Sequence, residues 1–224
     1  MDYYLHIPYT DLLKKQRPGR LDILWTDAAH QMRPENRPAD PNRLGSPMAR
    51  KKKMKTWIIV AAIAASVLAG GFLLPEELAV PVLGATRADW NPNAFWHPWG
   101  ASGVHKGIDI FAKEGTEVIA AAPGIVLHAG TIALGGNVVS VLGPKWRIHY
   151  YAHLKEIRAS RGQYVSRGDV IGTVGTTGNA AGKPPHLHYA IITQVPYVWL
   201  YRPERFGWER MFYLNPHEKL TAVK

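Results

Sequence analysis

The sequence predicts an all-β fold, an antiparallel β-sandwich or open barrel, preceded by one hydrophobic helix. After residue 101 the chain becomes a series of short apolar runs separated by glycines, and 17 of its 21 glycines lie in 84–224. Glycine at this density is typical of many tight turns and therefore of many short strands. No stretch with helical periodicity longer than about three turns competes with this pattern. The hydrophobic helix is predicted from 19 consecutive uncharged residues, 56–74.

Seven of the apolar runs are expected to form strands. Breaks such as Pro123-Gly124, Gly135-Gly136 and Gly143-Pro144 separate them. Because no helical segment lies between the runs, an antiparallel sheet follows. The expected strands are 107–110, 117–120, 124–129, 137–142, 147–154, 170–174 and 186–192.

Residues 1–55 are expected to form a disordered, basic and proline-rich tail. Their composition has no sustained apolar period and cannot bury enough surface to fold independently. Within the tail, the segment 21–25 (Leu-Asp-Ile-Leu-Trp) can form an isolated strand or a turn of helix.

The segment 56–74 is expected to enter a membrane. As a helix it is about 28 Å long, close to the hydrocarbon thickness of a bilayer. Five positive charges in 50–55 precede it, and such a flank stays in the cytoplasm, which sends the rest of the chain across. Either the segment is an uncleaved anchor, or translation starts at Met48 and the segment is a signal peptide cleaved near 69–71. In both cases the following domain is extracytoplasmic, for example periplasmic, and is either membrane-anchored or secreted.

The remaining chain is expected to contain one domain. The proline- and tryptophan-rich stretch 75–94 reads as a linker, 95–216 as the domain, 193–213 as an aromatic and arginine-rich insertion, and 217–224 as a tail.

Composition limits the chemistry that the domain can perform. Because the chain contains no cysteine, disulfides, thiolate metal sites and cysteine nucleophiles are excluded, and any metal must be held by His, Asp or Glu. The net charge is +10, which suits either general solubility or attraction to a polyanionic cell wall or a membrane surface. Nucleic acid is not an expected partner, because no recognised binding motif accompanies the charge.

Histidines suggest a metal centre. His105 and Asp109 stand four residues apart at the start of an expected strand, and His186 and His188 stand two apart within another. In a strand, side chains two residues apart point to the same face. A catalytic zinc ion takes three protein ligands and leaves one position open. One histidine of the pair, with His105 and Asp109, completes such a set, while the other histidine and His153 lie close by.

The order of these motifs resembles the LytM/lysostaphin-type family of zinc metallopeptidases, the M23 peptidases. The resemblance covers roughly residues 95–192 in unbroken order. The matching motifs are His105-Lys106-Gly107-Ile108-Asp109, Gly115-Thr116-Glu117-Val118, Gly124-Ile125-Val126, Tyr151-Ala152-His153-Leu154, Gly168-Asp169-Val170-Ile171-Gly172, Gly175-Thr176-Thr177-Gly178 and Pro185-His186-Leu187-His188-Tyr189.

The resemblance implies a zinc-dependent endopeptidase that hydrolyses stem or cross-link peptides of bacterial peptidoglycan. It implies His105, Asp109 and His188 as Zn²⁺ ligands, and His153 and His186 as catalytic groups that do not bind the metal. Because some relatives have lost ligands and regulate other wall hydrolases, a non-hydrolytic, wall-binding regulator is the alternative.

Further residues are expected near the metal on weaker grounds. Tyr151 is a candidate contact for the oxyanion. His149 lies two residues before Tyr151, so regular alternation places it on the same face as His153. The chain departs from the family at Lys183-Pro184 and in the long segment after Ile192. That insertion can reshape the substrate groove, bind a partner or pack on the sheet. The sequence leaves the oligomeric state open.

Overall fold

The computed structural model describes residues 47–99 and 103–222, and the side chains of 51–99 and 103–222. Most of the expected tail, including the segment 21–25, lies outside the described residues.

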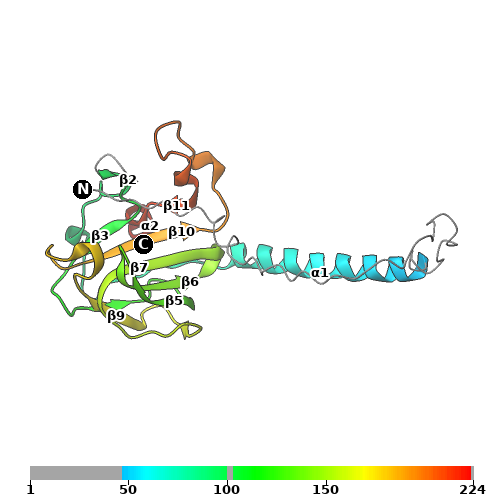
Figure 1. Cartoon of the computed structure of the whole chain (residues 1–224), viewed down its shortest axis with the longest axis horizontal. Coiled ribbons are helices and arrows are strands. Elements are labelled where there is room, and N and C mark those ends of the chain that lie inside the picture. Colours follow the sequence, from blue (N-terminus) through cyan, green and yellow to red (C-terminus); the bar gives the residue numbers. More distant parts are fainter. Residues whose placement is uncertain (1–46, 100–102, 223–224) are drawn as a thin grey trace, which may run out of the picture. The chain divides into compact units, whose positions relative to one another are not determined.

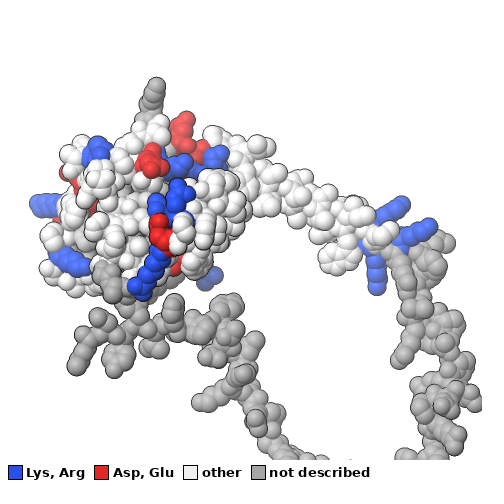
Figure 2. Space-filling view, turned by 90° about the horizontal axis from the view of Figure 1, so that it is seen from above, with Lys and Arg blue, Asp and Glu red and all other residues white. Residues whose placement is uncertain are grey.

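The first described element is a long apolar helix, α1 (Pro47–Leu73). It starts nine residues before the expected segment 56–74, because proline is favoured in a first helical turn and the Ala, Arg, Lys and Met residues that follow are good helix formers. It ends two residues before Pro75, as the restriction on residues preceding proline predicts. From Lys51 to Leu73 it is long and apolar enough to cross a membrane, with a mean hydropathy of 2.1. Figure 2 shows its uncharged surface beyond a group of lysines.

The rest of the described chain is built on an antiparallel sheet of nine strands. Strands β11, β10, β7, β6, β5 and β8 follow one another across it, β3 pairs with β10, and β9 joins β4 to β7 (Figure 1). The strands are β3 (Ile108–Phe111), β4 (Glu117–Ile119), β5 (Gly124–Ile132), β6 (Gly136–Leu142), β7 (Arg147–Ile157), β8 (Tyr164–Val165), β9 (Val170–Val174), β10 (His186–Thr193) and β11 (Tyr213–Leu214).

This architecture confirms the predicted fold class, and the barrel is not closed. All seven expected strands are present, with ends shifted by up to three residues. Two-residue strands were not expected from the sequence, because a run this short shows no period. They are β8, β11 and a separate hairpin of β1 (Pro98–Trp99) and β2 (Gly103–Val104).

The hydrophobic core lies on one face of the sheet. Alternate residues of β3 and β10 supply it, so that Ile108, Ile110, Leu187, Tyr189 and Ile191 are all inaccessible to solvent. The period of two expected for a strand therefore matches the burial of β3.

The segment 75–94 is not the linker that the sequence suggests, because it packs into the domain. Leu78, Val82 and Trp90 are buried in the core. The amide of Ala79 donates a 2.9 Å hydrogen bond to the carbonyl of Ala121, and Val82 forms a bridge with Val118 of β4. The sequence does not predict this packing for two reasons. Prolines interrupt the alternation of apolar residues in this segment, and its backbone groups bond to a sheet edge that exists only in the folded domain.

Glu76, three residues after α1 ends, is already packed into the domain. The carboxylate of Glu76 forms a buried ion pair with the guanidinium of Arg147, the first residue of β7. Only 4% of the Glu76 side chain and 7% of the Arg147 side chain are exposed. His149 Nε2 lies 3.7 Å from the same carboxylate, and its Nδ1 lies 2.8 Å from the hydroxyl of Tyr189. A polar cluster thus fixes the start of the domain to the central strand.

The C-terminal segment is also structured, whereas 217–224 was expected to be a tail. Residues Pro216–Thr221 form helix α2, which starts with Asn215 accepting a hydrogen bond from the amide of His217. Leu220 on this helix is buried in the core. Six residues are too few for a clear apolar period, which is why the sequence does not reveal this helix.

The insertion begins after Thr193, the last residue of β10. Its second half includes the 3₁₀ turn η7 (Glu209–Phe212) and packs against the domain. Glu209 forms an ion pair with Lys106, and the ring of Tyr213 lies 6.1 Å from that of Trp96. This half therefore supports the segment that leads to His105. Its first half carries several exposed apolar side chains.

Candidate metal centre

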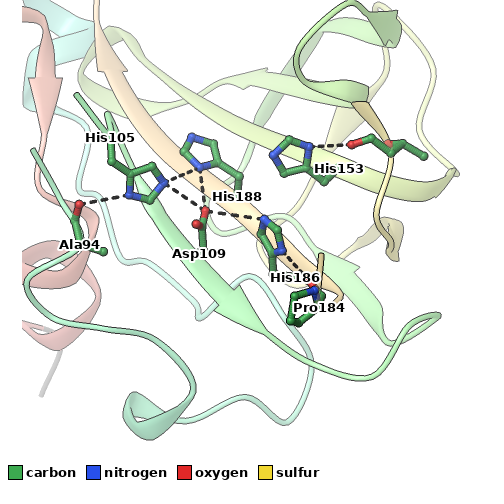
Figure 3. Close-up of polar contacts among 8 residues, drawn as sticks. Ala94, His105, Asp109, His153, Pro184, His186 and His188 are labelled. Atoms are coloured by element: carbon green, nitrogen blue, oxygen red, sulfur yellow. Dashed lines mark hydrogen bonds and ion pairs between the residues drawn. The ribbon is translucent and has the colours of Figure 1, made fainter. Parts of the chain in front are cut away.

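Three predicted metal ligands converge at one end of β3 and β10. Asp109 of β3 is directly opposite His188 of β10 in the antiparallel register, and His105 precedes β3. Asp109 Oδ1 lies 3.1 Å from His105 Nε2 and 2.9 Å from His188 Nδ1, and the two nitrogens are 3.0 Å apart. Figure 3 shows these side chains pointing toward one another. They form a group that could hold a metal ion.

The surroundings fix which atom of each imidazole faces the centre. His105 donates from Nδ1 to the carbonyl of Ala94 at 3.1 Å, which leaves Nε2 for the centre. His188 instead uses Nδ1, and its ring packs over Gly107. A methyl group at position 107 would overlap the carbonyl oxygen of Tyr189 and crowd the His188 ring. Gly107 therefore permits the close approach of β3 to β10 beside the ligands.

Electrostatics favour an anionic Asp109. Burial alone would raise the pKa of Asp109, but hydrogen bonds from His105 and His188 hold it far below its usual range. Burial lowers the pKa of His188 despite the neighbouring carboxylate, so this ring is neutral at neutral pH. Burial also disfavours the charged form of His105, but the hydrogen bond and negative charge of Asp109 outweigh it and raise the pKa of His105.

This donor set fits a catalytic zinc ion. Two imidazole nitrogens and one carboxylate oxygen are ligands that zinc prefers, and three protein ligands leave a fourth position open. A tetrahedral zinc ion with bonds of about 2.1 Å places its ligand atoms about 3.4 Å apart. The observed separations of 2.9–3.1 Å are slightly shorter. Small outward movements of the side chains would accommodate the ion.

The two other predicted histidines border the same centre. His186 donates from Nδ1 to the carbonyl of Pro184 at 2.8 Å, and His153 donates from Nδ1 to the carbonyl of Thr177 at 2.9 Å. Both rings are thereby held in the tautomer whose Nε2 is free to accept a proton. The two ring centroids are 5.2 Å apart, and His186 Nε2 is 4.0 Å from Asp109 Oδ1. The structure thus gathers all five of these side chains (Figure 3).

A β-bulge turns His153 toward the centre. Tyr151 pairs with Val139 of β6 and Leu154 pairs with Asn137, so two residues of β7 lie opposite one residue of β6. His153 takes a φ of 64° within this bulge. This left-handed conformation is uncommon for residues other than glycine. Burial, followed by the electrostatic effect of the neighbouring His188, lowers the pKa of His153 to about 4, so His153 is neutral at neutral pH.

The bulge reverses the expected placement of Tyr151 and His149. Both point into the core rather than toward the metal centre, and both are fully buried. The hydroxyl of Tyr151 accepts a hydrogen bond from the amide of Ala121 at 2.9 Å. Alternation counted back from His153 fails here, because the bulge shifts the pattern by one residue.

Tyr150 occupies the position that the sequence assigned to its neighbour. Its ring stands edge-on to His188, with centroids 6.3 Å apart, and it lines the cleft above the metal centre. The cross-strand pairing of Tyr151 with Tyr189 could have identified Tyr150. Since the expected ligand His188 faces the cleft, its neighbour Tyr189 must face the core, and so must Tyr151, which lies opposite Tyr189. Tyr150, one residue before Tyr151, then faces the cleft.

The centre opens into a cleft of about 630 Å³. Apolar side chains, including Trp99, Phe111 and Leu134, form much of its wall. The unusual Lys183-Pro184 sequence also lies in this wall, and Lys183 Nζ is 5.6 Å from the centre of the Trp99 ring. The departure from the family pattern therefore affects the substrate side of the centre.

Comparisons with known proteins show which proteins this chain resembles. Residues 103–198 match the model of peptidase family M23. The L-Ala–D-Glu endopeptidase of Bacillus subtilis (strain 168) is 36% identical over 115 residues, which are 47% of this chain and 35% of that protein. The peptidoglycan DD-endopeptidase ShyC of Vibrio cholerae is 33% identical over 105 residues, which are 47% of this chain and 24% of that protein. The chain thus spans about a third or less of each.

A solved structure of lysostaphin from Staphylococcus simulans supports the fold. The two structures align with a TM-score of 0.50 at 23% identity, over 67% of this chain and 55% of lysostaphin. At this level of identity the likeness concerns the fold. Together with the family match, it confirms the resemblance in the sequence: residues 103–198 match peptidase family M23, and the fold is of the LytM/lysostaphin type.

Proposed function

We propose that this protein is a zinc-dependent endopeptidase that hydrolyses peptide bonds in the stem or cross-link peptides of bacterial peptidoglycan. The observation that carries the proposal is the convergence of His105, Asp109 and His188 at the floor of an open cleft. The two relatives named above are endopeptidases, and the name of one of them specifies peptidoglycan. Their names indicate different bonds, so the proposal is limited to this substrate class.

His105, Asp109 and His188 would hold the ion. When bound, zinc supplies Lewis acidity and makes hydroxide available near neutral pH. The carboxylate of Asp109 balances part of the positive charge. The carbonyl of Ala94 keeps the His105 ring oriented, as hydrogen-bond partners of metal-binding histidines commonly do.

His153 and His186 would move protons during hydrolysis. Each is held by a backbone carbonyl with an unprotonated Nε2 directed away from that carbonyl. One of them can therefore accept a proton from the attacking water and pass it to the leaving amine, and the other, after taking up a proton from solvent, can donate a hydrogen bond to the developing oxyanion. Tyr150, which borders the cleft beside His188, is positioned to donate a further hydrogen bond.

The proposed site of action is outside the cytoplasm, where the polymer lies. The apolar helix α1 and its basic flank support this location, because they would leave the flank in the cytoplasm and carry the domain across the membrane. We further propose that α1 remains as an anchor, since its apolar stretch exceeds the usual length of the apolar core of a signal peptide.

The test compares purified full-length variants in detergent on isolated peptidoglycan, with mass spectrometry of released fragments and elemental analysis of bound zinc. His188→Ala should lose both stoichiometric zinc and hydrolysis. His153→Ala should keep zinc and lose roughly 10²–10⁴-fold in rate. His128→Ala is the control, since this residue of β5 is not part of the cleft. A zinc-loaded wild-type protein that releases no fragments would favour the non-hydrolytic regulator.

A further inference from the structure

The central strands separate two functional ends of the sheet. At one end, His188 of β10 pairs with Ala152 of β7, beside the metal centre. At the other end, Thr193 pairs with Arg147. Five residues separate these pairs along β10, which corresponds to about 17 Å. We call the second end the Arg147 end.

Chain connectivity keeps the Arg147 end close to α1. The helix ends at Leu73, and Glu76 is fixed to Arg147 by the buried ion pair. Three residues span at most about 11 Å, whatever direction the helix takes. If α1 is a membrane anchor, the Arg147 end must therefore remain near the bilayer surface.

This same end exposes a group of apolar side chains. The first half of the insertion carries Val195, Val198, Trp199 and Tyr201, which are 39%, 65%, 69% and 52% exposed. Leu127, 39% exposed on β5, lines a shallow hollow together with Val195. We call these five residues the apolar collar.

The collar is attached firmly to the anchored end. The hydroxyl of Tyr197 accepts a hydrogen bond from Arg147 Nη2 at 3.2 Å, so the same arginine holds both Glu76 and the insertion. The ring of Trp199 stacks on Tyr197 with centroids 4.9 Å apart. The exposed tryptophan is therefore supported from beneath.

A cation accompanies the collar. Arg202 follows Tyr201 directly and is exposed. Tryptophan and tyrosine are enriched where membranes meet water, because their rings combine an apolar body with a polar group. Lys and Arg side chains favour the same zone and attract anionic headgroups.

We infer that the apolar collar docks into the headgroup region of the membrane that α1 enters, and that the cleft is thereby held at the opposite end of the sheet, facing the wall. The inference rests on the proposed anchor. The bilayer is favoured over a second copy of the chain because the three-residue connection already holds the collar close to it, and a tethered contact forms at high effective concentration.

The absence of cysteine makes a direct test possible. The full-length variants Trp199→Cys and Val198→Cys, labelled with a polarity-sensitive fluorophore, are reconstituted into vesicles of phosphatidylethanolamine and phosphatidylglycerol. Leu134→Cys is the matched control, since Leu134 is similarly exposed (58%) but lines the cleft at the other end. Quenching is measured with nitroxide-labelled lipid and with aqueous iodide. The three replaced side chains are exposed, so these variants should fold.

Docking predicts that nitroxide lipid quenches the labels at 198 and 199 several-fold more than the label at 134, and that iodide does the reverse. Equal quenching at the two ends would overturn the inference. Protection from iodide without quenching by lipid would indicate a protein partner and would equally overturn it. If alkaline washing removes the protein from the vesicles, the anchor fails and the docking falls with it. Zinc content and peptidoglycan hydrolysis, measured on the same samples, report separately on the proposed activity.

Discussion

The buried ion pair between Glu76 and Arg147 makes a sharp prediction about where the domain begins. Replacing Glu76 by alanine removes the carboxylate and leaves the guanidinium of Arg147 buried, with only 6% of that residue exposed. Breaking a buried pair in this way typically costs about 3–5 kcal/mol. Tyr197 still contacts Arg147 Nη2, so we expect the lower end of this range, about 3 kcal/mol.

For a domain of this size, 1 kcal/mol shifts the melting temperature by about 2–4 °C, so Glu76→Ala should melt about 10 °C below the wild type. The assay is thermal unfolding of the full-length protein in detergent, followed by near-ultraviolet circular dichroism. The neighbouring Glu77 is the matched control. Its side chain is 73% exposed and lies 3.5 Å from Arg167, and an exposed pair contributes at most about 1 kcal/mol.

A double variant separates the charge from the packing. In Glu76→Ala/Arg147→Met no buried charge remains, and replacement of a buried pair by apolar residues is often neutral. The double variant should therefore be more stable than Glu76→Ala alone. Our reasoning is refuted if Glu76→Ala melts no lower than Glu77→Ala, because 75–94 would then behave as the linker that the sequence suggested.

Three further predictions concern the site and its support. Tyr150→Phe should slow hydrolysis with little effect on stability. Tyr151→Phe should leave the Ala121 amide without its hydrogen-bond partner and lower the free energy of unfolding by about 1–3 kcal/mol. Rates and unfolding free energies of both variants test this contrast, and the opposite pattern would contradict the position of the β-bulge. Burial and the charge of Arg147 lower the pKa of His149 to about 3, below its unfolded value of about 6.5. Stability should therefore be complete above pH 6.5 and fall toward pH 3, by at most about 1.4 kcal/mol per pH unit for this group, and a pH series of unfolding should show a shallower slope for His149→Gln. Gly107→Ala should weaken zinc binding, because its methyl group would push β3 away from the His188 ring; unchanged affinity in a metal-competition titration would contradict this role.

The sequence predicts those parts of the structure that depend on local pattern. The strand containing Ile108 and Ile110 alternates between buried and less buried residues, and that period survives in the fold. The candidate site could be anticipated because His186 and His188 share a face only if they lie in a strand. By contrast, the choice of Nδ1 in one ring and Nε2 in another depends on carbonyls such as that of Ala94, which arrive from a different segment.

Other features depend on partners that a single sequence does not show. Leu78 and Val82 are buried only because the edge at Val118 offers unpaired backbone groups. The turn of His153 into the cleft depends on a bulge whose register is set by Asn137 and Val139 of the adjacent strand. Nothing in the local sequence of β7 indicates that His153 has a positive φ. The prediction therefore assumed regular alternation and placed Tyr151, rather than Tyr150, beside the metal centre.

Strand β7 connects the two ends of the domain, yet their perturbations should be independent. Arg147 begins the strand and forms the ion pair with Glu76, whereas His153 lies near its other end beside the candidate metal centre. Sites more than about 10 Å apart with no shared partners usually contribute additively to stability. At temperatures where Glu76→Ala remains folded, it should therefore bind zinc and hydrolyse peptidoglycan as the wild type does. A loss of zinc affinity under those conditions would mean that the buried ion pair also positions the metal ligands through β7.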